Sequence, residues 1–213
     1  MAKVIPTIIA KDFQELQEKI KKIEPYTKWA QLDIMDGRFV ENTTWRDPKE
    51  LKKLETDLSL EAHLMIWEPE ETIKEWIESG VKRIIFHYES THKRKEIIDE
   101  IKKAGLEAGM AIDTITPIEF IDAFMADLDL VLIMTVRPGK GGQEFIEETL
   151  FKIKNLRSKY PNVNIGVDGG INLETAKKAI EAGANILVSG SYIFNSGDIE
   201  HAIEELKGFF QKS

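Results

Sequence analysis

Short apolar runs alternate with charged, amphipathic stretches along all 213 residues of the chain. The runs are rich in aliphatic and β-branched residues, which favour strands, and the stretches between them carry apolar residues at helical spacing. The pattern predicts strands at Val4–Ile9, Trp29–Ile34, Leu58–Leu64, Arg83–His87, Glu107–Ile112, Leu128–Met134, Asn164–Val167 and Ile186–Ser189.

The predicted helices carry the usual end signals. Gly80, Gly105 and Gly183 each stand just past a helix and before the next strand. Proline or a capping residue stands at the expected helix starts Asp47-Pro48, Glu68-Pro69, Thr116-Pro117 and Asn172.

Eight strand–helix alternations suit either a closed parallel barrel or an open doubly wound sheet. The first strand is not followed by a glycine fingerprint, and unusual residues stand at many strand ends. These features favour an α/β fold of the (β/α)8 TIM-barrel type, formed by one domain over residues 1–213.

Composition narrows the possible partners. The formal net charge of −8 argues against nucleic acid and acidic membranes, which need a basic face. No apolar run approaches the length of a membrane span, and the N-terminus lacks the apolar stretch of a secretory signal. Cysteine is absent, so disulfides and thiolate metal sites are excluded. We therefore expect a cytoplasmic protein.

Two aspartates stand at the ends of predicted strands that lie three apart around the ring, Asp33 and Asp168. In α/β barrels the active site lies at the carboxyl ends of the strands, so the two carboxylates can face each other across the mouth. Inverting a stereocentre through a planar enediolate needs one group that removes a proton and one that returns it from the opposite face. Either aspartate alone could be a loop or capping residue, but the matched pair favours catalysis.

His63, at the end of the third strand, could bind a divalent metal together with the two aspartates. A lone histidine at a strand end is more often a packed, hydrogen-bonded residue than a ligand, but the two converging carboxylates favour the ligand. His87 and Glu89 are expected to support the site from behind, and His92 and His201 lie in charged helical segments that predict solvent exposure.

Small residues cluster in the loops after the last three strands. Such loops often bind phosphate in barrels, because glycine lets the backbone N–H groups approach the oxygens closely. A single Gly-Gly could be only a tight turn, but three such loops on one side of the mouth predict a phosphate site. The residues in question are Gly139, Gly141, Gly142, Gly169, Gly170, Gly190 and Ser191. Met35, Met65 and Met134 stand near strand ends, where they could fill the core or form an apolar ceiling over a planar intermediate.

The combination of motifs resembles the ribulose-phosphate 3-epimerase family over nearly the whole chain. The likeness is carried by Leu32-Asp33-Ile34-Met35-Asp36-Gly37-x-Phe39-Val40-x-Asn42, His63-Leu64-Met65, Pro138-Gly139-x-Gly141-Gly142-Gln143-x-Phe145, Val167-Asp168-Gly169-Gly170-Ile171 and Gly183-Ala184-x4-Ser189-Gly190-Ser191. The resemblance implies a barrel of the ribulose-phosphate-binding type that interconverts D-ribulose 5-phosphate and D-xylulose 5-phosphate.

The resemblance also implies roles for individual residues. Asp33 and Asp168 would be the acid/base pair and metal ligands, with His63 as a further ligand and zinc, iron, manganese or cobalt as the metal. The phosphate would be held by Gly142, Gly170, Gly190 and Ser191, and the three methionines would lie above the substrate. The family implies a homo-oligomer, a dimer or hexamer.

The chain departs from the family pattern around the mouth. Gln31 stands where the family has a metal-binding histidine, and its neutral carbonyl oxygen is a poorer zinc ligand than imidazole. Thr7 replaces the usual serine near the N-terminus and keeps the hydroxyl. Arg38, Arg137 and Lys140 are added charges that could accommodate a different anionic sugar phosphate, or could lie in solvent without a specific role.

Three other functions compete with pentulose phosphate epimerisation. The same carboxylates could epimerise a hexulose 6-phosphate such as allulose 6-phosphate. Related barrels that decarboxylate or form aldol-type bonds carry a D-x-K-x-x-D pattern, which this sequence lacks. A metal-free, non-catalytic sugar-phosphate binder is supported by Gln31 but disfavoured by the retention of both aspartates.

Overall fold

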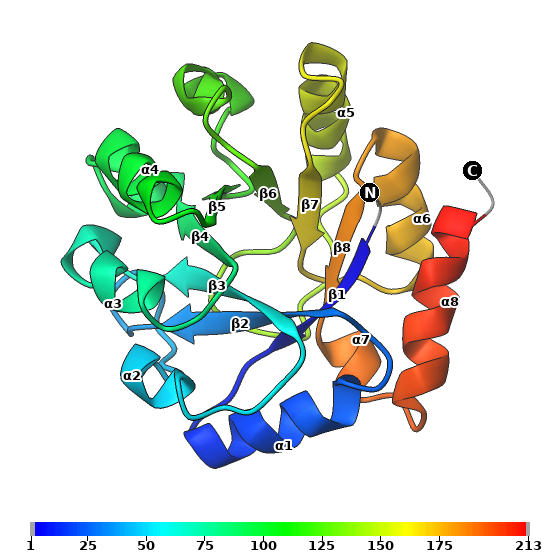
Figure 1. The fold of residues 1–213 in the computed structure, drawn as a ribbon. Helices are drawn as coiled ribbons and strands as arrows, with labels where there is room; N and C mark the ends of the chain where they lie inside the picture. Colours follow the sequence, from blue (N-terminus) through cyan, green and yellow to red (C-terminus); the bar gives the residue numbers. More distant parts are fainter. Residues whose placement is uncertain (1–2, 212–213) are drawn as a thin grey trace.

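The computed structural model describes residues 3–211, in which eight parallel strands close into a barrel (Figure 1). The strands are β1 (Lys3–Ile8), β2 (Trp29–Met35), β3 (Ser59–Met65), β4 (Arg83–His87), β5 (Glu107–Ile112), β6 (Leu130–Met134), β7 (Ile165–Asp168) and β8 (Ile186–Ser189). Each pairs with its neighbours in chain order, and β1 pairs with β8 to close the ring. The predicted TIM barrel is confirmed, with strand ends shifted by only one or two residues.

The helices lie around the outside of the strand ring (Figure 1). They are α1 (Phe13–Ile23), α2 (Pro48–Leu51), α3 (Ile73–Ile77), α4 (Arg94–Lys103), α5 (Thr149–Lys159), α6 (Leu173–Ala182), α7 (Ser191–Phe194) and α8 (Ile199–Gln211). Short 3-10 helices span Pro69–Glu71, Tyr88–Ser90 and Ile118–Phe124. Over the described part of the chain, no helix has the length and apolar character needed to cross a membrane.

The end signals act as predicted at most helices. Asn172 caps α6 by accepting hydrogen bonds from the backbone N–H groups of Glu174 and Thr175, and Gly183 ends it with a φ of 116°. Glu68-Pro69 and Thr116-Pro117 stand at the starts of 3-10 helices instead of α-helices. The fixed φ of proline suits the first turn of either helix type, so the sequence signal does not separate them.

Two apolar clusters stabilise the barrel. The larger lies between the strands and the surrounding helices, and includes Leu32, Leu64 and Phe86. The smaller fills one half of the barrel interior and consists of Ile5, Ile85, Ala111, Leu130, Leu132, Met134, Ile186 and Val188. Polar side chains lie on β2, β3 and the two ends of β4 instead, and all are at most 2% exposed: Gln31, Glu61, His63, Arg83 and His87. This polar part of the interior contains the candidate site.

Candidate active site

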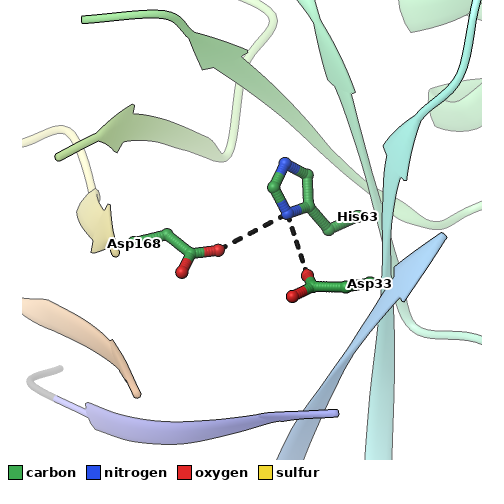
Figure 2. Close-up of side chains that lie close together, drawn as sticks. All are labelled: Asp33, His63 and Asp168. Atoms are coloured by element: carbon green, nitrogen blue, oxygen red, sulfur yellow. Dashed lines mark hydrogen bonds and ion pairs between the residues drawn. The ribbon is translucent and has the colours of Figure 1, made fainter. Parts of the chain in front are cut away.

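Asp33, His63 and Asp168 converge at the carboxyl ends of their strands (Figure 2). Side chains alternate along a strand, so Asp33 on β2 and His63 on β3 point into the barrel, where they meet Asp168 at the end of β7. His63 Nδ1 lies 3.1 Å from Asp33 Oδ1 and 3.4 Å from Asp168 Oδ2. All three are buried, and one ligand atom from each lies within 4.8 Å of the others. The carboxylates therefore face one common space.

Gln31 lies directly behind this group, two residues before Asp33 on β2. Its Nε2 is 2.8 Å from Asp33 Oδ1, 2.7 Å from Asp168 Oδ2 and 3.3 Å from His63 Nδ1. It also lies 3.1 Å from the hydroxyl of Thr7 on β1. The Oε1 of the same amide is buried and finds no hydrogen-bond partner among the described residues.

The charges of the site act on one another. Burial acts to lower the pKa of His63, but the carboxylates of Asp168 and Asp33 outweigh it and raise that pKa to about 9. Burial raises the pKa of Asp168; the hydrogen bond with His63 opposes this rise, and the nearby charge of Asp33 adds to it. A positive imidazolium between two acids is therefore the favoured arrangement in the metal-free protein.

The three residues Asp33, His63 and Asp168 could bind a metal ion. A tetrahedral site with bonds of about 2.1 Å has ligand atoms about 3.4 Å apart, close to the two distances from His63 Nδ1. The fourth ligand position of such a tetrahedral site is less favourable. Gln31, predicted as a ligand through its oxygen, presents its N–H group there, and would have to turn its amide to coordinate a cation.

His87 and Glu89 stand behind His63. The Nε2 atoms of the two histidines are 2.9 Å apart, and His87 Nδ1 lies 3.6 Å from Glu89 Oε2. Burial lowers the pKa of His87, so this ring stays neutral beside the charged His63. This geometry agrees with the expectation that His87 and Glu89 support the site from behind. The other two histidines, His92 and His201, are exposed, as expected.

A cavity of about 310 Å³ opens above the two aspartates. Nearly every residue that the sequence suggested for the substrate lines it: Thr7, Asp33, Met35, Met65, Met134, Gly139, Gly141, Gly142, Asp168, Gly169, Gly170, Gly190 and Ser191. His63 and Gln31 lie beneath the floor, with no exposed surface. The structure thus brings the predicted residues together, although their individual roles stay predictions.

Four of the phosphate-loop candidates, Gly139, Gly142, Gly169 and Gly170, have positive φ angles, which favour glycine. Gly170 has a φ of 64°, and a Cβ on it would lie 2.7 Å from the backbone nitrogen of Phe145. The loop after β7 therefore packs directly on the loop after β6, and the two form one continuous wall of the cavity.

Several residues that line the cavity are not indicated by the sequence pattern. Lys19, Phe194 and Asn195 reach the cavity from α1 and from the segment at the end of α7. No local signal marks them, because it is the closure of the barrel that brings these helices beside the mouth. Of the three basic residues that depart from the family pattern, Lys140 lines the cavity. Arg38 and Arg137 are not among the described residues that line it.

The loop after β6 is held by side-chain amides. Gln143 donates from Nε2 to the carbonyls of Arg137 and Lys140, both at 2.7 Å. Asn42, from the loop after β2, donates to the carbonyl of Gly139 at 2.5 Å. The Gln143 bonds hold the loop after β6 to itself, and the Asn42 bond ties this loop to the one after β2, which starts on the opposite side of the barrel.

Fold and site together define an α/β-barrel enzyme with opposed carboxylates in its mouth. The sequence profile described as the Ribulose-phosphate 3 epimerase family matches residues 3–194. The chain belongs to the ribulose-phosphate 3-epimerase family. It is 39% identical to the ribulose-phosphate 3-epimerase of Schizosaccharomyces pombe, covering 100% of this chain and 95% of that protein. It is 40% identical to the ribulose-phosphate 3-epimerase of Bacillus subtilis, covering 98% and 99% of the two chains.

Solved structures with the same fold are more distant. A 3-hexulose-6-phosphate synthase superposes with a TM-score of 0.74 at 14% identity, covering 98% of this chain and 99% of the other. The 3-keto-L-gulonate-6-phosphate decarboxylase from Vibrio cholerae gives a TM-score of 0.77 at 10% identity, with 98% and 97% covered. At these identities the likeness extends to the fold alone.

Proposed function

We propose that the protein interconverts D-ribulose 5-phosphate and D-xylulose 5-phosphate by moving the proton on carbon 3. The observation that carries this proposal is the pair of carboxylates, Asp33 and Asp168, that face one another in a single cavity walled by glycine loops. Family membership supports the choice of a pentulose phosphate, since the matched relatives are named ribulose-phosphate 3-epimerases.

The two aspartates would exchange the proton from opposite faces of the sugar. One carboxylate removes the carbon-3 proton to give a planar enediolate, and the other, in its acid form, delivers a proton to the far face. Burial raises the pKa of Asp168, which suits a group that spends part of the cycle protonated. In the reverse direction the two residues exchange roles.

The residues under the cavity floor would orient the acids. His63 contacts both carboxylates, and Gln31 and Thr7 extend the same network to β1. A divalent cation such as zinc, iron, manganese or cobalt, when bound by Asp33, His63 and Asp168, would polarise the ketone oxygen of the substrate.

The phosphate would bind at the side of the cavity lined by Gly142, Gly170, Gly190 and Ser191. Backbone N–H groups without a neighbouring Cβ can approach phosphate oxygens closely. Met35, Met65 and Met134 line the same cavity, which supports a place for them against the carbon chain of the substrate.

Solvent deuterium exchange at carbon 3 of ribulose 5-phosphate tests the proposal. Asp33→Asn and Asp168→Asn should each lower exchange and turnover by about 100- to 10,000-fold, because each removes one acid/base group. Asp47→Asn is the matched control, since Asp47 caps α2 and asparagine caps equally well. Allulose 6-phosphate, assayed beside ribulose 5-phosphate, measures the preference for pentulose.

Wild-type protein that exchanges no deuterium, either without metal or with any of the four metals, would refute the proposal. Binding of ribulose 5-phosphate without turnover would establish the sugar-phosphate binder instead.

We also propose that the protein forms a homo-oligomer, a dimer or hexamer. Large apolar side chains are exposed at Ile115 (86%), Phe120 (54%) and Phe151 (71%), and such surface favours association. Light scattering coupled to size exclusion, with Phe151→Glu for comparison, measures the mass directly.

A further inference from the structure

The amide of Gln31 is placed as a bridge between the two aspartates. A carboxamide nitrogen carries two N–H donors, and its two shortest contacts, at 2.7 and 2.8 Å, are with Asp168 and Asp33. One donor is thus available for each carboxylate. The bridge joins a residue of β2 to one of β7, on opposite sides of the cavity floor.

The surroundings of the amide determine which end faces the acids. Turned around, the carbonyl oxygen would stand about 2.7 Å from oxygens of two carboxylates, and acceptor would meet acceptor with a negative charge on each side. Hydrogen bonds to ionised carboxylates are stronger than those between neutral groups. The observed orientation keeps both of these bonds although it leaves Oε1 buried without a partner among the residues described.

We propose that Gln31 is a positioning residue that allows this site to work without a resident metal, because its amide bridges Asp33 and Asp168 where a metal ion would otherwise hold them. The part of this inference that concerns activity without metal rests on the proposed function. The part that concerns metal affinity does not, because it involves only the protein and a cation.

The same geometry predicts a weak affinity for metal. A cation held by Asp33, His63 and Asp168 would face the N–H groups of Gln31 at its fourth corner. Coordination through the amide requires those donors to turn away, so both hydrogen bonds are lost when the metal binds. A histidine or a carboxylate at position 31 carries no such penalty, because each presents a lone pair directly.

Two variants at position 31 separate bridging by the amide from bridging by a metal. Gln31→Glu has nearly the same shape but no N–H donors, and it adds a third carboxylate. Gln31→His supplies an imidazole ligand. Each protein is stripped with a chelator and assayed for epimerase activity with and without added Mn²⁺ or Zn²⁺, and circular dichroism and thermal unfolding confirm that each variant is folded.

Wild type should keep its activity within about 3-fold on stripping, whereas stripped Gln31→Glu should lose at least about 100-fold and recover with metal, the scale expected when an acid/base pair is misplaced. Gln31→His should become dependent on metal in the same way. A wild type that depends on added metal as strongly as Gln31→His overturns the proposal.

Equilibrium dialysis with Mn²⁺ gives a readout independent of turnover. Wild type should bind about 10- to 100-fold more weakly than Gln31→His, the range by which groups around a metal change its affinity. NMR of the stripped wild type should show two slowly exchanging Gln31 side-chain protons, assigned by their absence in Gln31→Glu. Equal affinities, or rapidly exchanging amide protons, refute the bridge.

The two proposals fail in different ways. A wild-type protein that is inactive both when stripped and when loaded with metal overturns the proposed function and the claim of activity without metal. Equilibrium dialysis and NMR of the amide protons then still show whether Gln31 bridges the aspartates.

Discussion

Two clusters of buried charge lie inside the same barrel, one at each end. At the carboxyl ends of the strands, Asp33 and Asp168 share their space with His63 and Gln31. At the amino ends, Arg83 at the start of β4 pairs with Glu61 and Glu107.

The amino-end cluster contains a permanent cation. Arg83 Nη1 lies 2.6 Å from Glu61 Oε2, and the guanidinium also contacts Glu107 and stacks 4.6 Å from the ring centre of Trp29. Burial raises the pKa of Glu61 to about 7, and Arg83 opposes that rise. The short guanidinium contact favours the ionised form of Glu61, because an arginine side chain carries a permanent charge in proteins.

The carboxyl-end cluster contains no such permanent cation within the described residues. Its positive charge comes from His63, which can lose its proton, and its donors come from a neutral amide. A buried acid beside a permanent cation stays ionised and stabilises the fold. A buried acid beside a group that can itself lose its charge is free to gain and lose protons. This difference separates the stabilising end of the barrel from the reactive one.

The largest expected effect comes from breaking the amino-end cluster. Arg83→Met should lower the free energy of unfolding by about 3–5 kcal/mol, because it leaves Glu61 buried without its counter-charge. The double variant Arg83→Met/Glu61→Leu should recover most of this loss, and Lys95→Met, at an exposed pair, should lower the free energy of unfolding far less than Arg83→Met. Urea unfolding measures all three. If the single variant costs no more than Lys95→Met, the cluster does not stabilise the fold.

A smaller effect should follow from the titration of His63 in chelator-treated protein. Its folded pKa is raised from 6.5 to about 9, so its contribution to stability is complete below pH 6.5 and is lost as the pH rises through 9. The loss should be on the order of 3 kcal/mol. Urea unfolding from pH 6 to 9.5 measures it, and His63→Asn should lack this pH dependence. A difference between wild type and variant that stays constant with pH would contradict the assignment.

The smallest effects are expected in the loops of the reactive end. Gly170→Ala should raise KM for ribulose 5-phosphate by about 10-fold, equivalent to about 1.4 kcal/mol of lost binding, because the new Cβ collides with Phe145 and moves the loop. Gly142 has a similar φ of 73°, but nothing lies within 4 Å of a Cβ placed there. Gly142→Ala should therefore have a weaker effect on KM in steady-state assays. Equal effects would indicate that backbone strain, and not the loop contact, determines KM.

Sequence alone determined the barrel and the composition of its mouth. The alternation of apolar runs and amphipathic stretches predicted all eight strands, since strand and helix periodicities depend on local side-chain order. It also placed Asp33, His63 and Asp168 at strand ends, and in a parallel barrel such ends share one face.

Only the tertiary structure decided how these residues meet. The Gln31 amide faces the aspartates through nitrogen, Lys19 and Asn195 enter the cavity lining, and Arg137 stays out of it. Each outcome depends on distances between segments far apart in the chain, such as β2 and β7. Side-chain order within a segment carries no information on these distances, because they are fixed when the ring closes and packs.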